Sequence, residues 1–249
     1  MKKKSVVVTG GNSGIGFKIT EAFINAGYYV IVGARRDLNL NKKFGNRVSF
    51  IPTDVRDEDA HIDLVNAAIS KAGQLDIYIN NAGFSEWRPI GDIDNNFLDN
   101  IISTNLKGAF WGCKAASSVM KDGASIINIS SIAGKRGSTN NSAYCATKFG
   151  MNGLTQSLAK ELGPSGIRVN GVCPVIVETD GLIEALKSPY SPGYPNPKEF
   201  ILNFKKTNAS LGRLPTGSEI ASMCLMLSSD SASAVTGQCI NVDCGVFPQ

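Results

Sequence analysis

The sequence predicts an α/β fold with one doubly wound parallel sheet of about seven strands and helices on both faces. Short runs rich in valine and isoleucine alternate with longer stretches of helical periodicity, which is the pattern of repeated strand–helix units. Successive strands are then parallel, because each helix crosses back over the sheet. The length of 249 residues suits a single domain spanning 1–249, since α/β folds of this size are commonly single.

The predicted elements follow one another along the whole chain. We expect strands near residues 5–9, 28–33, 48–52, 75–80, 124–130, 168–173 and 238–242. We expect helices near 14–26, 57–72, 95–120, 143–162, 197–208 and 218–228. Ligands bind beyond the carboxyl ends of parallel strands, so the residues that follow the strands should gather at one edge.

The first strand–helix unit contains a glycine-rich turn. The buried run Val6-Val7-Val8 leads into Thr9-Gly10-Gly11-Asn12-Ser13-Gly14-Ile15-Gly16, and apolar residues then recur at helical spacing. Such a turn lets the backbone approach a pyrophosphate, whose charge is favoured at the N-terminus of a helix. The turn therefore predicts a Rossmann-type dinucleotide site, with contacts from Gly10, Asn12, Ser13, Gly14, Ile15 and Gly16.

The second strand ends at a pair of arginines. A site that prefers NAD usually has an acidic residue about 20 positions beyond the glycines, where it holds the ribose 2′-hydroxyl. This chain has Arg35 and Arg36 instead, and arginine suits a 2′-phosphate. We expect NADP(H) to be favoured over NAD(H). The alternative is that both arginines are solvated and Asp37 reads the ribose.

A tyrosine and a lysine stand four residues apart on the helix expected near 143–162. The spacing places Tyr144 and Lys148 on one helix face, one turn apart. A phenol titrates near pH ~10 when unperturbed, and a neighbouring cation favours its ionised form. The pair is suited to exchange a proton with an alcohol or carbonyl oxygen.

These motifs and several others together resemble the short-chain dehydrogenase/reductase family over nearly all of the chain, including its branch of 3-oxoacyl-carrier-protein reductases. Asn80-Asn81-Ala82-Gly83 is similar to the family's NNAG motif, and Thr236-Gly237-Gln238 with Val242-Asp243 resembles a late signature. The resemblance implies a catalytic tetrad of Asn105, Ser131, Tyr144 and Lys148. It also implies cofactor contacts from Asp54, Val55, Asn81, Ala82, Gly83, Tyr144, Lys148, Pro174, Val177 and Thr179.

The resemblance further implies a reaction. Hydride passes between NADP(H) and a secondary alcohol or ketone, with Tyr144 as general acid/base. Lys148 lowers the pKa of the phenol and binds the nicotinamide ribose, Ser131 orients the carbonyl, and Asn105 holds a water. A homotetramer is implied too, with the helices near 95–120 and 143–162 pairing between subunits through some of Ile101, Phe110, Trp111, Met151 and Leu154.

Two positions depart from the family pattern. Pro174 is followed by Val175 where glycine is usual, which could narrow the site or shift the loop. The late signature reads Asp243-Cys244-Gly245 where the family has Asp-Gly-Gly, and we expect an effect on packing or assembly more than on chemistry.

The substrate region is predicted around residues 175–217. Ser188 to Pro197 holds four of the ten prolines of the chain, so it cannot be helical, and it is expected to belong to a substrate lid and not to a passive surface excursion. A polar substrate is expected: sugar-like, carboxylated, or a 3-oxoacyl group on an acyl carrier protein. The candidate pocket residues are Phe84, Glu86, Trp87, Arg88, Lys135, Arg136, Asn140, Asn141 and Glu178.

Composition excludes other classes. The net charge of +4 is small and unclustered, which argues against nucleic-acid binding. No run approaches the ~20 apolar residues of a membrane span, so a cytoplasmic protein is expected. The single histidine, His61, and six cysteines without a C-x-x-C motif make no metal site. Two alternatives stay open: a catalytically silent NADP(H)-binding sensor or scaffold, and a sheet-based module that binds no nucleotide.

Overall fold

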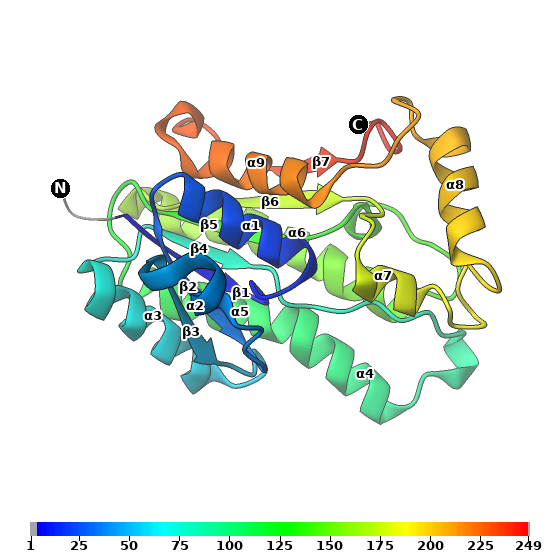
Figure 1. Ribbon diagram of the computed structural model, residues 1–249, viewed down its shortest axis with the longest axis horizontal. Coiled ribbons are helices and arrows are strands. Elements are labelled where there is room, and N and C mark those ends of the chain that lie inside the picture. The colour runs from blue at the N-terminus through cyan, green and yellow to red at the C-terminus, as the bar shows by residue number, and fades with distance from the viewer. Residues whose placement is uncertain (1–3, 249) are drawn as a thin grey trace.

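The computed structural model describes residues 4–248, so residues 1–3 and 249 of the predicted domain lie outside it. The predicted fold class is confirmed: within the described residues, a seven-stranded parallel sheet has the order β3-β2-β1-β4-β5-β6-β7 (Figure 1). The strands are β1 (Ser5–Thr9), β2 (Tyr29–Ala34), β3 (Val48–Pro52), β4 (Ile77–Asn80), β5 (Ser125–Ile129), β6 (Arg168–Pro174) and β7 (Cys239–Val242).

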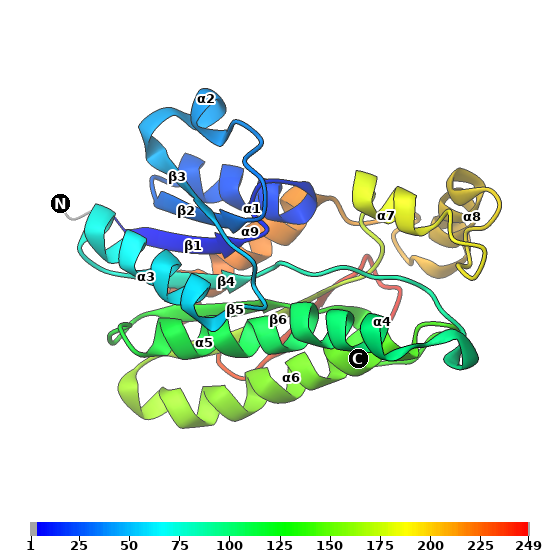
Figure 2. The same ribbon diagram turned by 90° about the horizontal axis from the view of Figure 1, so that it is seen from below.

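Helices cover both faces of the sheet, with α1 and α9 on one side and α5 and α6 on the other (Figure 2). The α-helices are α1 (Gly14–Asn25), α2 (Leu40–Phe44), α3 (Glu58–Ala72), α4 (Asn95–Ile102), α5 (Gly108–Ser117), α6 (Ser142–Leu162), α7 (Asp180–Ala185), α8 (Pro197–Asn208) and α9 (Gly217–Ser228).

The valine run of β1 shows why the central strands are apolar throughout. Val6 and Val8 pack into the core under α1 and α9, whereas Val7 packs into the opposite core with residues of α3, α5 and α6. All three side chains are fully buried. Successive side chains of a strand point to opposite faces, so a strand covered on both faces is a continuous apolar run.

The prediction of one helix over 95–120 was wrong in its interior and at its end. A π-helical turn, Ser103–Lys107, separates α4 from α5, and α5 ends at Ser117. The amide of Gly108 bonds to the carbonyl of Ser103, five residues earlier. The wider turn contains Asn105, and single π turns within helices are frequent at functional sites.

Two short helices were missed because five or six residues are too few to show a period. They are α2, before β3, and α7, after β6.

The segment between β6 and α9 has a hydrophobic cluster of its own. Leu186, Ile201 and Leu214 of this segment are buried against Trp87, which comes from the stretch after β4. The segment is therefore a packed unit attached to the edge of the sheet, and Trp87 anchors it to the chain that follows β4.

Candidate active site

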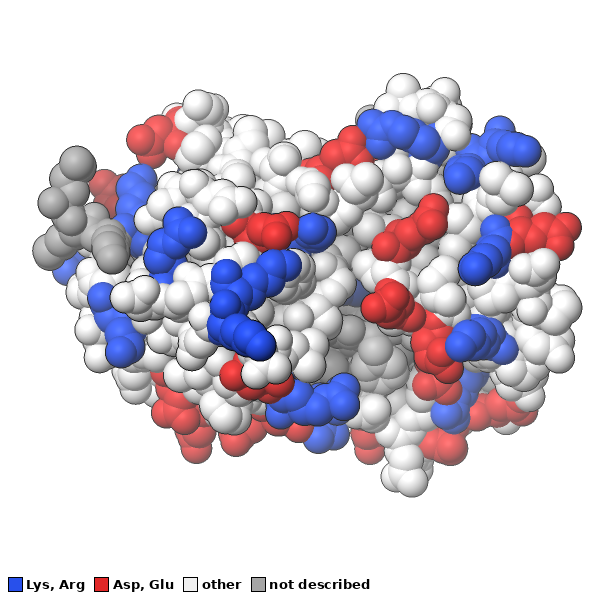
Figure 3. All heavy atoms as spheres, in the orientation of Figure 1, with Lys and Arg blue, Asp and Glu red and all other residues white. Residues whose placement is uncertain are grey.

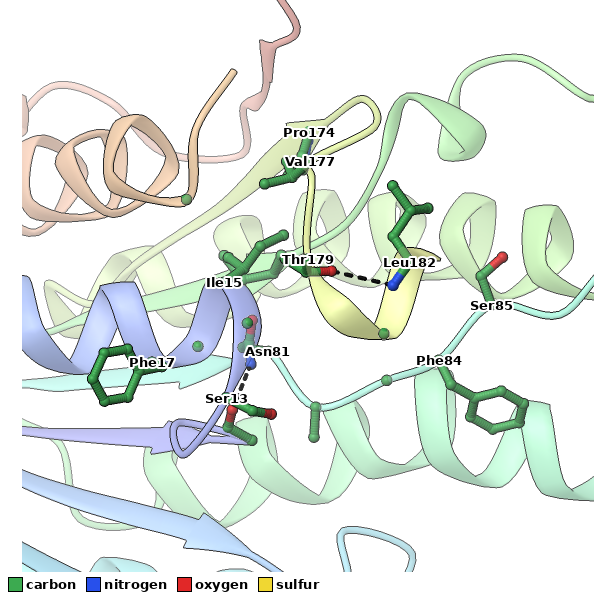
Figure 4. Close-up of a pocket in the computed structure, with 18 of the residues that line it drawn as sticks. Ser13, Ile15, Phe17, Asn81, Phe84, Ser85, Pro174, Val177, Thr179 and Leu182 are labelled. Atoms are coloured by element: carbon green, nitrogen blue, oxygen red, sulfur yellow. Dashed lines mark hydrogen bonds between the residues drawn. The ribbon is translucent and has the colours of Figure 1, made fainter. Parts of the chain in front are cut away.

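A cleft of about 1180 Å³ opens beyond the carboxyl ends of the strands and is visible as a hollow in the molecular surface (Figure 3). Every residue that the sequence assigns to the cofactor lines this cleft. Its walls come from the glycine turn, from the ends of β2, β3, β4, β5 and β6, and from α6. Figure 4 shows the parts contributed by the glycine turn, by the chain after β4 and by the chain after β6. One edge of the sheet thus gathers the predicted residues, as parallel topology requires.

The glycine turn needs glycine at two positions for different reasons. Gly14 has a φ of 52°, a left-handed conformation that other residues rarely adopt. At Gly16 an added methyl group would overlap the carbonyl oxygen of Gly10 and the amide of Asn81. The Asn81 amide itself donates to the carbonyls of Thr9 at 2.9 Å and Gly10 at 3.3 Å, and so ties the end of β4 to the turn.

The N-terminus of α1 is prepared for an anion. Ser13 stands at the N-cap in an extended conformation, yet among the described residues its side chain makes no capping bond to the helix. The first turn, which is wholly described, has no acidic side chain either. The first-turn N–H groups are left for an external acceptor, so this turn fits the pyrophosphate of a dinucleotide.

The two arginines after β2 line the same cleft. The side-chain amide of Asn12 donates to the carbonyl of Arg36 at 2.8 Å, which holds the arginine loop against the glycine turn. Asp37 has another role: its carboxylate accepts from the amide of Leu40 at 3.3 Å, at the start of α2. Asp37 does not line the cleft.

The sequence prediction missed a basic residue at this end of the cleft. Arg56 lines it and grips Asp54, with its Nε 2.9 and 3.0 Å from the two carboxylate oxygens. The hydrogen bond from Arg56 holds the pKa of Asp54 below its usual value. In the sequence, Arg56 follows Asp54 by two residues, and this spacing alone does not mark it as a site residue.

Lys148 lies deep in the site. Its side chain is enclosed, with only 4% of the residue exposed, and its ammonium donates to the carbonyl of Ile129 at 2.8 Å. Burial lowers the pKa of Lys148 to about 8. One helical turn away, the Tyr144 ring has its centre 5.7 Å from the Lys148 nitrogen.

The Tyr144 and Ser131 side chains line the cleft together. Burial raises the pKa of Tyr144 to about 12, and the nearby Ser131 hydroxyl opposes that rise. Ser131 is itself fixed, because its hydroxyl accepts from the amide of Ala133 at 3.1 Å and donates to the carbonyl of Pro174 at 3.4 Å. The phenol therefore keeps its proton at neutral pH and presents it next to a second hydroxyl, an arrangement that can protonate a carbonyl oxygen.

Asn105 lies behind these groups. Its side chain accepts from the amide of Phe84 at 3.0 Å and donates to the carbonyl of the same residue at 2.7 Å. A side chain on Gly83 would approach both the side-chain oxygen Oδ1 of Asn105 and the Nζ of Lys148. Asn105 thus fixes the chain that leaves β4 beside Lys148.

Part of the predicted substrate pocket was wrong. Phe84 and Glu178 line the cleft, but Glu86, Trp87 and Arg88 line a second hollow of about 270 Å³ with Ser188, Pro189 and Tyr190. Within the described chain, Lys135, Arg136, Asn140 and Asn141 line neither hollow. The loop after Ser131 turns away from the cleft: the Arg136 guanidinium lies 5.3 Å from the centre of the Phe247 ring instead.

The segment that leads into α9, at the end of the predicted lid, also forms a wall of the cleft, although the sequence prediction named none of its residues individually. It lies there because α1 and α9 pack together, a contact between elements about 200 positions apart that no local pattern reveals. The additional lining residues are Leu214, Pro215, Thr216, Gly217 and Ser218.

Other site types find no support in residues 4–248. The described chain has no group of three or more His, Cys, Asp or Glu that could hold a metal ion. None of its helices has the length and apolar character of a membrane span. His61 is enclosed, with its ring nitrogens 2.7 Å from the Tyr78 hydroxyl and 3.0 Å from the Val55 carbonyl.

Comparison with known proteins agrees with this geometry. A family model described as enoyl-(acyl carrier protein) reductase matches residues 10–247. The chain is 34% identical to the 3-oxoacyl-[acyl-carrier-protein] reductase FabG of Chlamydia muridarum, covering 98% of this chain and 97% of the relative. It is also 34% identical to L-2,3-butanediol dehydrogenase of Corynebacterium glutamicum, covering 98% of each.

A solved structure from Brucella melitensis, titled short-chain dehydrogenase/reductase SDR:glucose/ribitol dehydrogenase, superposes with a TM-score of 0.87. It is 33% identical and covers 99% of this chain and 97% of its own. The substrates named for these relatives differ, whereas the fold is shared.

Proposed function

The chain belongs to the short-chain dehydrogenase/reductase family, and from that premise we propose that it is an NADP(H)-dependent reductase of small hydroxylated ketones, working in reverse on the corresponding alcohols. Membership makes it an NAD(P)-dependent oxidoreductase acting on alcohol and carbonyl groups. The observation that carries the proposal is that Ser131, Tyr144 and Lys148 line one cleft together with the glycine turn.

In the proposed reaction the bound dinucleotide supplies or accepts the hydride. The side chains of Ser131 and Tyr144 hold the substrate oxygen. The Tyr144 hydroxyl donates its proton to that oxygen during reduction, and the Tyr144 phenolate takes a proton from it during oxidation. Lys148 stabilises the phenolate left after reduction and would bind the nicotinamide ribose. Asn105 holds the chain beside Lys148, while Pro174, Val177 and Thr179 would enclose the nicotinamide.

The preference for NADP(H) rests on Arg35 and Arg36. Both line the cleft, directly after β2, and Arg56 lies in the same wall after β3. The acidic residue closest in sequence, Asp37, is engaged at the start of α2. A 2′-phosphate placed here would meet guanidinium groups that can bind it bidentately, whereas a bare ribose would leave them without a partner.

The substrate class rests on the charges of the opposite wall. Lys135 and Arg136 would have favoured a carboxylate or an acyl carrier protein, but they lie outside the cleft lining. The charged residues that line it after β6 are Glu178 and, at the first position of α7, Asp180. These carboxylates suit hydroxyl donors and repel anions, so an uncharged hydroxylated ketone is favoured over a carboxylated or carrier-bound one.

We further propose that residues 175–217 cover the bound substrate and that the chain forms one catalytic domain. The separate hydrophobic cluster of this segment supports movement as a unit.

A substrate panel tests the proposal. We measure turnover of six compounds: acetoin, dihydroxyacetone, D-galactose, ribitol, acetoacetate and an acetoacetyl thioester. Carbonyl compounds are tested with NADPH and with NADH, and alcohols and sugars with NADP⁺ and with NAD⁺. We expect turnover of uncharged hydroxylated compounds with NADPH or NADP⁺. Turnover of the charged compounds or thioester alone would overturn the substrate class. Tight NADPH binding without any turnover would favour the silent sensor instead.

A further inference from the structure

Asn140 has an unusual backbone conformation close to the active site. Its φ is 57°, in the left-handed region, which asparagine tolerates better than most residues but which still marks a constrained position. It lies two residues before the start of α6 and four residues before Tyr144. A strained residue at this point fixes how the chain enters the helix that carries the proposed proton donor.

Asn140 also joins two other segments to that entry. Its carbonyl accepts from the amide of Arg88 at 2.7 Å, and its side-chain amide donates to the carbonyl of Tyr190 at 3.1 Å. The first partner belongs to the stretch after β4, and the second to the proline-rich run before α8. One residue therefore connects three chain segments that are about 50 positions apart in sequence.

The two segments that Asn140 joins are held on their other sides as well. The Arg88 guanidinium pairs with Glu86 at 2.7 Å and with Asp94 at 3.6 Å, and lies 4.1 Å from the centre of the Phe97 ring. The Asp92 carboxylate lies near the Tyr190 hydroxyl and raises its pKa. The second hollow, of about 270 Å³, is lined by residues of both segments. One of them is Glu86, and the residue before it, Ser85, lines the main cleft.

We propose that Asn140 is a positioning residue for the substrate: its side-chain amide latches the proline-rich segment, at Tyr190, to the start of the catalytic helix α6. The inference rests on the proposed function of Tyr144 and of residues 175–217. With the latch closed, the part of residues 175–217 that lines the cleft is held in place. Without the latch, this part opens more often, and the substrate binds less tightly while the proton donor itself is unchanged.

The variant Asn140→Gly isolates the latch. Glycine adopts a φ of 57° without strain and keeps the carbonyl that binds Arg88, so only the amide to Tyr190 is lost. Asn39→Gly is the matched control, because Asn39 has a φ of 60° at the start of α2 and no side-chain capping bond within the described chain. Asn140→Asp keeps the size and conformation of the residue but replaces the amide donor with an acceptor.

Limited proteolysis measures how often the segment around Tyr190 detaches from Asn140. Chymotrypsin cleavage of the bond between Tyr190 and Ser191, followed by mass spectrometry, should be about 2- to 10-fold faster in Asn140→Gly and in Asn140→Asp, since a neutral hydrogen bond stabilises by about that factor. The melting temperature of Asn140→Gly should not fall, and Asn39→Gly should behave as the wild type. Unchanged cleavage in both Asn140 variants would overturn the latch.

Kinetics separate positioning from a purely structural role. With the panel carbonyl that the wild type reduces fastest, both Asn140 variants should raise KM about 2- to 10-fold and leave kcat and NADPH affinity within about twofold. An equal loss of kcat with a lowered melting temperature would show a structural role and contradict the inference. Absence of Tyr144-dependent turnover would overturn the proposed function, whereas the cleavage result would still decide the latch.

Discussion

The ammonium of Lys148 lies 5.7 Å from the centre of the Tyr144 ring, one turn along α6; Lys148 is buried and Tyr144 is half-buried. Burial acts on them in opposite directions, raising the pKa of Tyr144 to about 12 and lowering that of Lys148 to about 8. At neutral pH the phenol is therefore protonated, which suits reduction of a carbonyl. Oxidation of an alcohol needs the phenolate, and its rate should rise with pH.

Replacement of Tyr144 by phenylalanine tests the proton donor. Tyr144→Phe removes the hydroxyl but keeps the ring that packs near Phe97 and Ile101. We expect turnover of the best panel substrate to fall at least ~10²-fold, the usual contribution of general acid–base catalysis. The NADPH dissociation constant, measured by fluorescence titration, should hardly change. Near-normal turnover would assign proton transfer to another group.

The sequence was sufficient for the sheet and for most of the cleft, because both depend on local patterns. The valine run of β1 and the glycine turn after it each carry their own signal, and parallel topology brings the ends of the strands together. The resemblance to the family, which rests on local motifs, placed Ser131 with Tyr144 and Lys148, and all three line one cleft.

The parts that sequence did not reveal depend on contacts between distant elements. Thr216 and Gly217 reach the cleft only because α9 packs on α1, and Asp37 leaves it because a short helix follows. The direction of the loop after Ser131, with Lys135 and Arg136 outside the cleft, is fixed by packing near the C-terminus. No period or spacing along the chain encodes these positions.

Replacement of the arginines tests the cofactor preference. Arg35→Ala should weaken NADPH binding by about 1.5–3 kcal/mol, the contribution of a hydrogen bond to a charged group, and leave NADH binding nearly unchanged. If Arg36 carries the phosphate instead, Arg36→Ala will be severe and Arg35→Ala mild. Fluorescence titration with both cofactors distinguishes these outcomes, and Lys42→Ala on nearby α2 is the control. Equal NADH and NADPH affinity in the wild type would contradict the preference.

The buried ammonium of Lys148 should make stability depend on pH. Its folded-state pKa of about 8 lies below the ordinary value of 10.5. Between these two pH values Lys148 is therefore mostly protonated in the unfolded chain and mostly neutral in the folded chain. Protonation thus favours unfolding as pH falls from 10.5 toward 8, and the full cost of about 3 kcal/mol is present below pH 8, at 1.36 kcal/mol per pKa unit.

Lys148→Met removes this titration and provides the measurement. The free energy of unfolding in urea should rise between pH 8 and 10 more steeply for the wild type than for the variant, so that any advantage of the variant shrinks with pH. Turnover should be lost at every pH. Parallel pH curves for the two proteins would show that burial does not lower the pKa of Lys148.

Fewer of the named side chains are free to form the predicted homotetramer than the sequence suggested. Ile101, Met151 and Leu154 are buried within the protomer, but Phe110 on α5 is 48% exposed, and Phe149 on α6, which the sequence prediction did not name, is 48% exposed too. Burying such side chains contributes about 1.5–3 kcal/mol each. Phe110→Gln with Phe149→Gln should therefore lower the mass found by light scattering.

Ile90→Gln is the control for this experiment, because Ile90 is 79% exposed and lies outside α5 and α6. It should leave the mass unchanged. A wild-type monomer at micromolar concentration would contradict the prediction of a tetramer.

Cys244 departs from the glycine that the family has at this position, and the structure shows the consequence. Its φ is 56°, a left-handed conformation that costs a residue with a side chain roughly 1–2 kcal/mol. Cys244→Gly should relieve that strain, less what is lost where the side chain packs near Ala209 and Val246. We expect a net gain of about 1 kcal/mol, or about 2–4 °C in the thermal midpoint of a chain of this size.

Two variants serve as controls for Cys244→Gly. Cys244→Ser retains the side-chain carbon and should not gain stability. Gly245→Ala should lower the midpoint, because Gly245 has a φ of 79° and an added methyl group would meet the side chain of Ser210. A wild-type midpoint in Cys244→Gly would show that packing of the thiol outweighs the strain.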